Sequence, residues 1–298
     1  IFHLFCSLTF VLTTMLIVRS MASDENTLVF TKADTLATPP NAHYSVTTTH
    51  IFQLANGTIF YHRFFAFPQT IHVIHEGKEI VAQLPNDNDC FGVHGNALYF
   101  ESLSKFYKAS ISSAESAVSI TFLRSLLEGE DVHNGALCSR KRNGKKFVYR
   151  MCDHPESDGI EIPEEAEKME GLVLSAIVGN KILYRQVNPE LKEPVARKLG
   201  ENAIVVDLPF SYRPSFLAHT SSQFIYFIDG VKLHTLDIEK LEFLAPLTLG
   251  VPVLAFGGVR NGVITILSGE EASTNWIATA RLPDGYVAKF IEHAVDDI

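Results

Sequence analysis

Three histidines are the side chains in this sequence best suited to chemistry at a shared site. His50, His94 and His219 each lie at or near the end of a short apolar segment, and the three segments are far apart in the chain. Three imidazoles that converge can bind zinc, because the neutral ring nitrogen is a preferred zinc ligand. The simpler interpretation is that each imidazole meets water or a backbone carbonyl alone. We therefore name the three as metal candidates only, and expect no cofactor.

Other patterns typical of enzymes are missing from the sequence. It contains no Gly-x-Ser-x-Gly nucleophile motif, no P-loop and no dinucleotide-binding glycine pattern. The run from His72 through His75 to Glu76 resembles a helical zinc-protease motif only superficially. On a strand, two histidines three residues apart point to opposite faces. We expect no catalytic residues and favour a protein that is not an enzyme.

One short segment concentrates positive charge. Six basic residues surround the Asn143-Gly144 turn: Arg140, Lys141, Arg142, Lys145, Lys146 and Arg150. Such a cluster can contact an acidic partner or act as a nuclear import signal, although a solvated hairpin tip has the same composition. Residues 153–170 follow with eight acidic residues and two prolines, which we interpret as a flexible insertion. The hairpin and this acidic segment are the loops most expected to bind a partner.

The elements that must position these side chains repeat along the chain. Six times a short turn, usually containing Asn or Gly, precedes an apolar cluster that usually carries a tyrosine. The clusters end at Tyr61, Tyr99, Tyr149, Tyr184, Tyr226 and Ile266, with steps of 38, 50, 35, 42 and 40 residues. A period of about 40 residues, with each unit built of short strands, is typical of a β-propeller.

On this period and strand pattern the chain resembles the β-propeller superfamily from about Tyr44 to His293. The resemblance implies an all-β fold, a six-bladed β-propeller of four-stranded antiparallel blades. The Trp-Asp dipeptide of WD repeats and the kelch pattern are both missing. Five or seven blades stay open because the third unit is irregular. Residues 1–22 form an apolar leader, 23–43 an N-terminal segment whose Leu28–Lys32 could close the ring, and 44–298 one propeller domain.

The innermost strands decide whether a propeller can hold a cation in its channel. Enzymes of the lactonase or calcium-esterase type use oxygen ligands from Glu, Asn and Asp there. The inner strands expected here contain no carboxylate; they are Ile51–Ala55, Cys90–His94, Ala136–Ser139, Leu172–Ile177, Ser215–Thr220 and Val253–Gly258. This argues against a calcium or magnesium site. A channel-sited hydrolase or metal enzyme that uses His94 and His219 is the alternative.

Composition and cysteines limit the remaining possibilities. A net charge of −9 and a pI near 5.7 argue against general nucleic-acid binding, which requires basic residues to neutralise phosphates. If the third hairpin turns at Asn143-Gly144, Cys138 faces Tyr149 and is out of register with Cys152, whereas a turn at Lys145 would align the two thiols. Free thiols are the preferred interpretation, and they suit a reducing compartment.

The apolar leader allows more than one cellular location. Ile1–Val18 carries no Lys, Arg, Asp or Glu. Translation that starts at Met21 would give a cytoplasmic protein, which we favour, whereas cleavage of a signal peptide after Ala22 would give a secreted one. A retained leader would be a membrane anchor. We expect a monomeric scaffold that binds another protein through its loop face; a secreted ligand-binding propeller is a further alternative.

Overall fold

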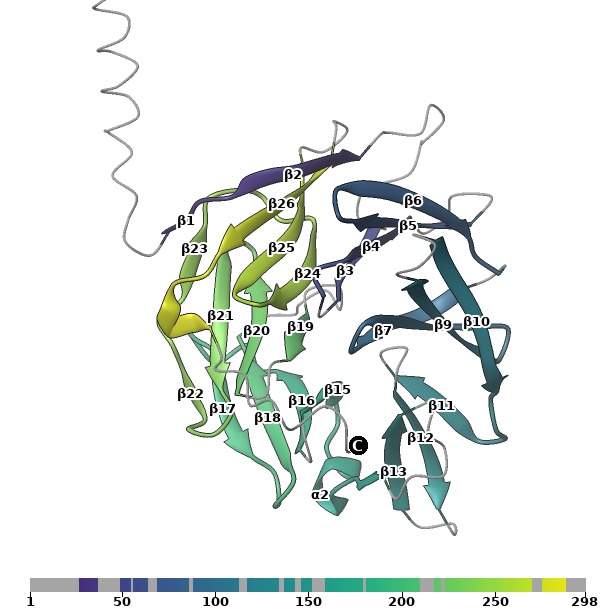
Figure 1. Cartoon of the computed structure of the whole chain (residues 1–298). Helices are drawn as coiled ribbons and strands as arrows, with labels where there is room; N and C mark the ends of the chain where they lie inside the picture. Colours follow the sequence, from purple (N-terminus) through teal and green to yellow (C-terminus); the bar gives the residue numbers. More distant parts are fainter. Residues whose placement is uncertain are drawn as a thin grey trace, which may run out of the picture.

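The computed structural model describes residues 27–36, 49–54, 56–63, 69–85, 88–112, 117–133, 137–142, 146–151, 159–178, 181–209, 217–220, 223–269 and 275–287. Nearly all regular structure in these ranges is β-strand, arranged as separate sheets around a ring (Figure 1). The all-β propeller prediction is therefore confirmed. The turn signals act as expected: Gly57, Gly230 and Gly262 have φ of 85°, 53° and 71°, which glycine adopts without a steric penalty.

The first two blades add their strands in chain order from the centre of the ring outward (Figure 1). The first blade contains β3 (Thr49–Gln53), β4 (Ile59–Arg63), β5 (Thr70–His75) and β6 (Lys78–Gln83). The second contains β7 (Asn88–His94), β8 (Ala97–Ser102), β9 (Lys105–Ser112) and β10 (Ala117–Ser125). Every neighbouring pair in these two blades is antiparallel.

The third blade differs from the expected unit. Its strands are β11 (Glu130–His133), β12 (Leu137–Arg142), β13 (Lys146–Met151) and β14 (Ile160–Glu161). The inner strand predicted over Ala136–Ser139 is wrong, because β12 is the second strand of the sheet and β11 pairs along its other edge. The predicted register is wrong by one residue, since Cys138 faces Arg150 rather than Tyr149. Cys152 lies outside the described residues.

The fourth blade contains a parallel pair. A short helix, α2 (Glu164–Glu167), precedes it. The strand order is β15 (Val173–Val178), β16 (Lys181–Val187), β18 (Ala203–Leu208) and β17 (Val195–Lys198). The chain passes from β16 to the outer edge, forms β17, and returns so that β18 lies between them and runs parallel to β16. The polar segment 188–194 makes this crossing.

The expected fifth unit forms a sheet of six strands. They are β19 (Leu217–Thr220), β20 (Phe224–Asp229), β21 (Lys232–Asp237), β22 (Glu242–Phe243), β23 (Leu247–Leu249) and β1 (Thr27–Leu28). The stretch that follows β21 does not form a single outer strand. Pro246 has no N–H to donate to a ladder, and β22 and β23 on either side of it both pair with β21. β1 then adds in parallel beside β23.

The last blade takes its outer strand from the start of the described chain. It contains β24 (Ala255–Arg260), β25 (Val263–Ser268), β26 (Asn275–Arg281) and β2 (Thr31–Leu36). β2 pairs antiparallel with β26 and so takes the outer position of this blade. The chain makes a 3-10 turn at Asp284–Tyr286, and residues 288–293 lie outside the described part.

The number of blades also needs correction. Within the described residues five sheets are four-stranded and the sheet built on β19–β23 has six strands, so the molecule has five four-stranded blades rather than the six predicted, a number that the sequence had left open. The physical reason is that the outer strand of the predicted fifth unit is broken into two pieces, which leaves an edge that β1 covers. Exposed strand edges promote association, and covering them removes that risk.

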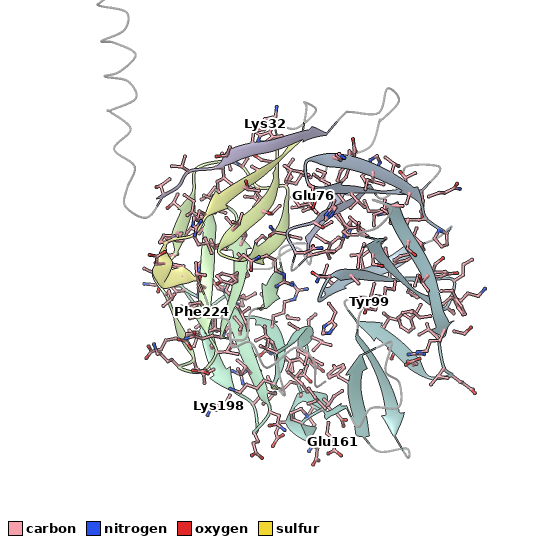
Figure 2. All side chains as sticks on the ribbon, in the orientation of Figure 1. Lys32, Glu76, Tyr99, Glu161, Lys198 and Phe224 are labelled. Atoms are coloured by element: carbon pink, nitrogen blue, oxygen red, sulfur yellow. The ribbon has the colours of Figure 1, made fainter. Side chains whose placement is uncertain are left out.

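The hydrophobic core lies in the seams between adjacent sheets. Phe60 of β4 and Phe100 of β8 are fully buried where the first two blades meet. The repeated tyrosines also point inward: Tyr99 is 3% exposed and lies inside the molecule, whereas Lys32 and Lys198 lie at its periphery (Figure 2). The repeated tyrosines therefore contribute to the packing between blades. In the described part of the chain, no helix has the length and apolar character to cross a bilayer.

Candidate functional site

The central strands bring some of the predicted site residues toward the middle of the ring. β24 contacts both β3 and β19, and β19 also contacts β15. His50 on β3 and His94 on β7 are half-buried, and His219 belongs to β19, although its side chain lies outside the described part. Among the side chains that the structure describes, no three of the types His, Cys, Asp and Glu gather as a metal site.

The inner strands carry more charge than the sequence suggested. The prediction that they contain no carboxylate is wrong, because β7 begins at Asn88 and includes Asp89. A register shift between Asp89 and Gly92 marks a bulge, and a bulge hides the start of a strand from an alternation pattern. β24 ends at Arg260, and burial lowers the pKa of the Arg260 guanidinium to about 10.

A histidine-aromatic cluster joins the first two blades near the centre. His50 and His62 face each other across β3 and β4, and His62 is fully buried. The ring of Phe91, from β7, lies 4.8 Å from the ring of His62 and 6.3 Å from that of His50. Burial, together with the positive charge of His50 and His72 when protonated, lowers the pKa of His62 to about 4. Neutral His62 is therefore the form that this seam accommodates.

The basic cluster falls on the hairpin β12–β13. Arg140, Lys141 and Arg142 are the last three residues of β12, and Lys146 is the first of β13. Arg142 lies directly opposite Lys146 in the register. Lys145 lies outside the described residues. The register thus places two residues of like charge at opposite positions, an arrangement that is generally unfavourable in an antiparallel pair.

The acidic segment is folded over the part that the structure describes. The prediction of a flexible insertion is wrong for residues 159–170, because β14 pairs with β13 and α2 follows directly. The acidic side chains of Glu161, Glu164 and Glu167 are exposed, and Glu161 lies at the periphery of the molecule (Figure 2). Lys168 donates a hydrogen bond to Glu164 over 2.6 Å. The third blade thus carries a basic hairpin and an acidic surface.

One polar group on the first blade escaped sequence reasoning. On β5, Thr70 Oγ1 lies 3.3 Å from Nε2 of His72. The other ring nitrogen of His72, Nδ1, lies 2.8 Å from Oε1 of Glu79 on β6. Tyr61 on β4 donates its hydroxyl to the same carboxylate oxygen, and its ring stacks on the ring of His72 with centroids 4.6 Å apart. A hydroxyl, an imidazole and a carboxylate are therefore in line.

A local signal for this group exists in the sequence. Thr70 and His72 are two residues apart, so they share a face of a strand. Glu76-Gly77 is a tight turn, with φ of 49° and 74°, and it returns Glu79 beside β5. The run from His72 to Glu76 is not a helical zinc motif, because His72 and His75 lie on a strand and His75 bonds to Thr58. The relevant partners were two residues before His72 and seven residues after it.

Comparisons with known proteins add little. No family model matches the sequence, and no curated protein matches it. One similar solved structure is the glutaminyl cyclase of Myxococcus xanthus, with 10% sequence identity and a TM-score of 0.37, covering 80% of this chain and 93% of that chain. A similarity at this level supports no inference about the activity of this chain.

Proposed function

We propose that this protein is a propeller scaffold that binds another protein through the hairpin β12–β13. The observation that carries the proposal is the position of Arg142 opposite Lys146. A cross-strand pair contributes roughly 0.2–1 kcal/mol when favourable, and like charges reverse the sign. A partner with an acidic surface would neutralise a pair of like charges placed in this way.

The charge distribution supports a partner with an acidic surface. The chain has a net charge of −9, yet six basic residues lie between positions 140 and 150. The carboxylate nearest to Arg140 in the register belongs to Glu130, which already accepts two hydrogen bonds from Arg124, of 2.7 and 2.8 Å. The Glu130 carboxylate is thus largely committed to Arg124. Positive patches of this kind steer an acidic protein and fix its orientation.

Charge reversal of the hairpin tests this proposal. We expect the variant Arg140→Glu, Lys141→Glu and Arg142→Glu to bind a partner at least ~10-fold more weakly than wild type, because opposite potentials become like potentials. The measurement is quantitative pull-down followed by titration of each recovered partner. Raising salt from 0.1 to 1 M, which shortens the screening length from ~10 to ~3 Å, should weaken the wild-type complex as well.

A matched control keeps the same change in net charge. Lys78, Lys105 and Lys198 are exposed on three other sheets, and their reversal to Glu should leave binding within about twofold of wild type. Equal recovery of the partner by wild type and the hairpin variant would remove the hairpin from the binding site.

A further inference from the structure

The line of Thr70, His72 and Glu79 has the order of groups that activates a hydroxyl nucleophile. In such a relay the hydroxyl meets one ring nitrogen and a carboxylate meets the other. Here Thr70 Oγ1 is 3.3 Å from Nε2, and Glu79 Oε1 is 2.8 Å from Nδ1. The first distance is somewhat long, which is common where no substrate is bound.

The carboxylate selects the tautomer of the imidazole. An ionised carboxylate can only accept hydrogen bonds, so Nδ1 of a neutral His72 must carry the proton that it shares with Glu79. Nε2 is then unprotonated and faces the Thr70 hydroxyl as an acceptor. The proton on that hydroxyl therefore has a base beside it.

The three groups are held by paired strands. Thr70 and His72 belong to β5, and β6 carries Glu79 opposite Ile74, one diagonal step from His72. Tyr61 fixes this arrangement from β4, because its hydroxyl bonds to Glu79 and its ring stacks on His72. Sites built on strands hold their geometry better than sites on loops.

The group is open to small molecules. The side chain of His72 is 27% exposed and that of Glu79 is 46% exposed. Val81, opposite His72 in the register, is 55% exposed and offers an apolar contact. Gln83 lies opposite Thr70, and a side-chain amide beside a nucleophile can donate to a developing oxyanion. These neighbours offer one apolar and one polar contact to a bound ester.

We propose that Thr70, His72 and Glu79 form a hydrolytic site for small carboxylic esters. Thr70 Oγ1 bonds to the carbonyl carbon while its proton passes to Nε2 of His72. The carbon–oxygen bond to the alcohol then breaks, and His72 returns the proton to the departing alkoxide. Water then attacks the acyl carbon while His72 Nε2 takes its proton. The bond between the acyl carbon and Thr70 Oγ1 breaks, and His72 returns the proton to Oγ1, which restores the hydroxyl and releases the carboxylic acid. Glu79 is a positioning residue, and it stabilises the imidazolium.

This site is independent of the proposed protein-binding hairpin. It lies on the outer half of the first blade, whereas the hairpin belongs to the third. It also differs from the channel-sited hydrolase considered for His94 and His219, since neither residue takes part. Success or failure of one proposal therefore leaves the other unaffected.

The test uses the full chain with p-nitrophenyl acetate and a fluorophosphonate probe. We expect turnover by wild type, and an acetyl or phosphonyl adduct on Thr70 in the mass spectrum of the digested protein. Thr70→Val, which keeps the shape and removes the hydroxyl, should lower turnover at least ~100-fold and abolish the adduct. Thr70→Ser should keep turnover within about tenfold, because it retains the nucleophile.

Variants of the other two groups separate catalysis from folding. Glu79→Gln should lower turnover at least ~10-fold, because an amide can donate to Nδ1 and so invert the tautomer, whereas Glu79→Asp should recover part of it. Thr121→Val, at an exposed strand threonine of the second blade, should match wild type. Equal turnover by Thr70→Val and wild type would overturn the proposal. So would an adduct confined to other residues of the wild-type protein, a result that does not depend on any variant folding.

Discussion

At the scale of single residues, acid sensitivity centres on His62. Its ring is fully buried between the first two blades, against Phe91, and its pKa is lowered from 6.5 to about 4 by burial first and by the neighbouring histidines second. The unfolded chain takes up a proton at His62 near pH 6.5, while the folded chain resists until about pH 4. Stability is therefore complete above the higher value and is lost as the pH falls through this window.

We predict a loss of about 3 kcal/mol from this one group between pH 7 and pH 4, since each unit of pKa shift corresponds to about 1.4 kcal/mol. Guanidinium unfolding at a series of pH values measures it. His62→Phe should flatten the slope over that range. Part of the slope should remain, because burial also lowers the pKa of His234. An unchanged slope in the variant would assign the acid sensitivity to other groups.

The sequence patterns did not indicate the group formed by Thr70, His72 and Glu79. The identities of Thr70, His72 and Glu79 are plain in the sequence, and so is the turn between the strands. The sequence does not show that Glu79 lies diagonally across from His72. That position depends on the register of β5 against β6. A shift of one residue would have sent Glu79 to the opposite face.

At the scale of elements, even a very short strand can stabilise a sheet by covering its exposed edge, as β1 does beside β23. β1 has two residues, yet Leu28 is 6% exposed and packs in a core cluster with Leu247 and Leu249 of β23. Its neighbour Val29 is 77% exposed. The sequence indicated one strand over Leu28–Lys32, but the chain divides this segment between two different sheets.

We predict that Leu28→Ala lowers the free energy of unfolding by about 2–4 kcal/mol, because it removes a buried side chain and leaves a cavity. Val29→Ala is the matched control and should change it by less than about 0.5 kcal/mol. Urea unfolding compares the two variants. Similar values for both would mean that β1 contributes little to the sheet.

At the scale of the whole molecule, two of the sheets in the ring include the N-terminal strands β1 and β2. β2 pairs with β26 of the last blade, and β1 pairs with β23 of the six-stranded sheet. Both pairings join residues more than two hundred positions apart. Without β2, the outer edge of β26 would present unpaired N–H and C=O groups, which readily pair with another chain.

We predict that a chain starting at residue 37 self-associates, whereas a chain starting at residue 27 behaves as the parent molecule does. Size-exclusion chromatography with light scattering measures both. A larger apparent mass only for the shorter chain is the expected outcome. Equal masses for the two chains would show that β26 tolerates an open edge.

The sequence alone determined the all-β class, the repeat near 40 residues and most hairpins, because turns such as Asn56-Gly57 and Asp229-Gly230 depend on local backbone preferences. It also placed the basic cluster on a hairpin. Only the tertiary structure decided that β18 lies parallel to β16, that β1 and β2 belong to different sheets, and that Thr70, His72 and Glu79 meet. These outcomes depend on pairing between strands, and pairing is decided by which partner buries a face or satisfies an edge.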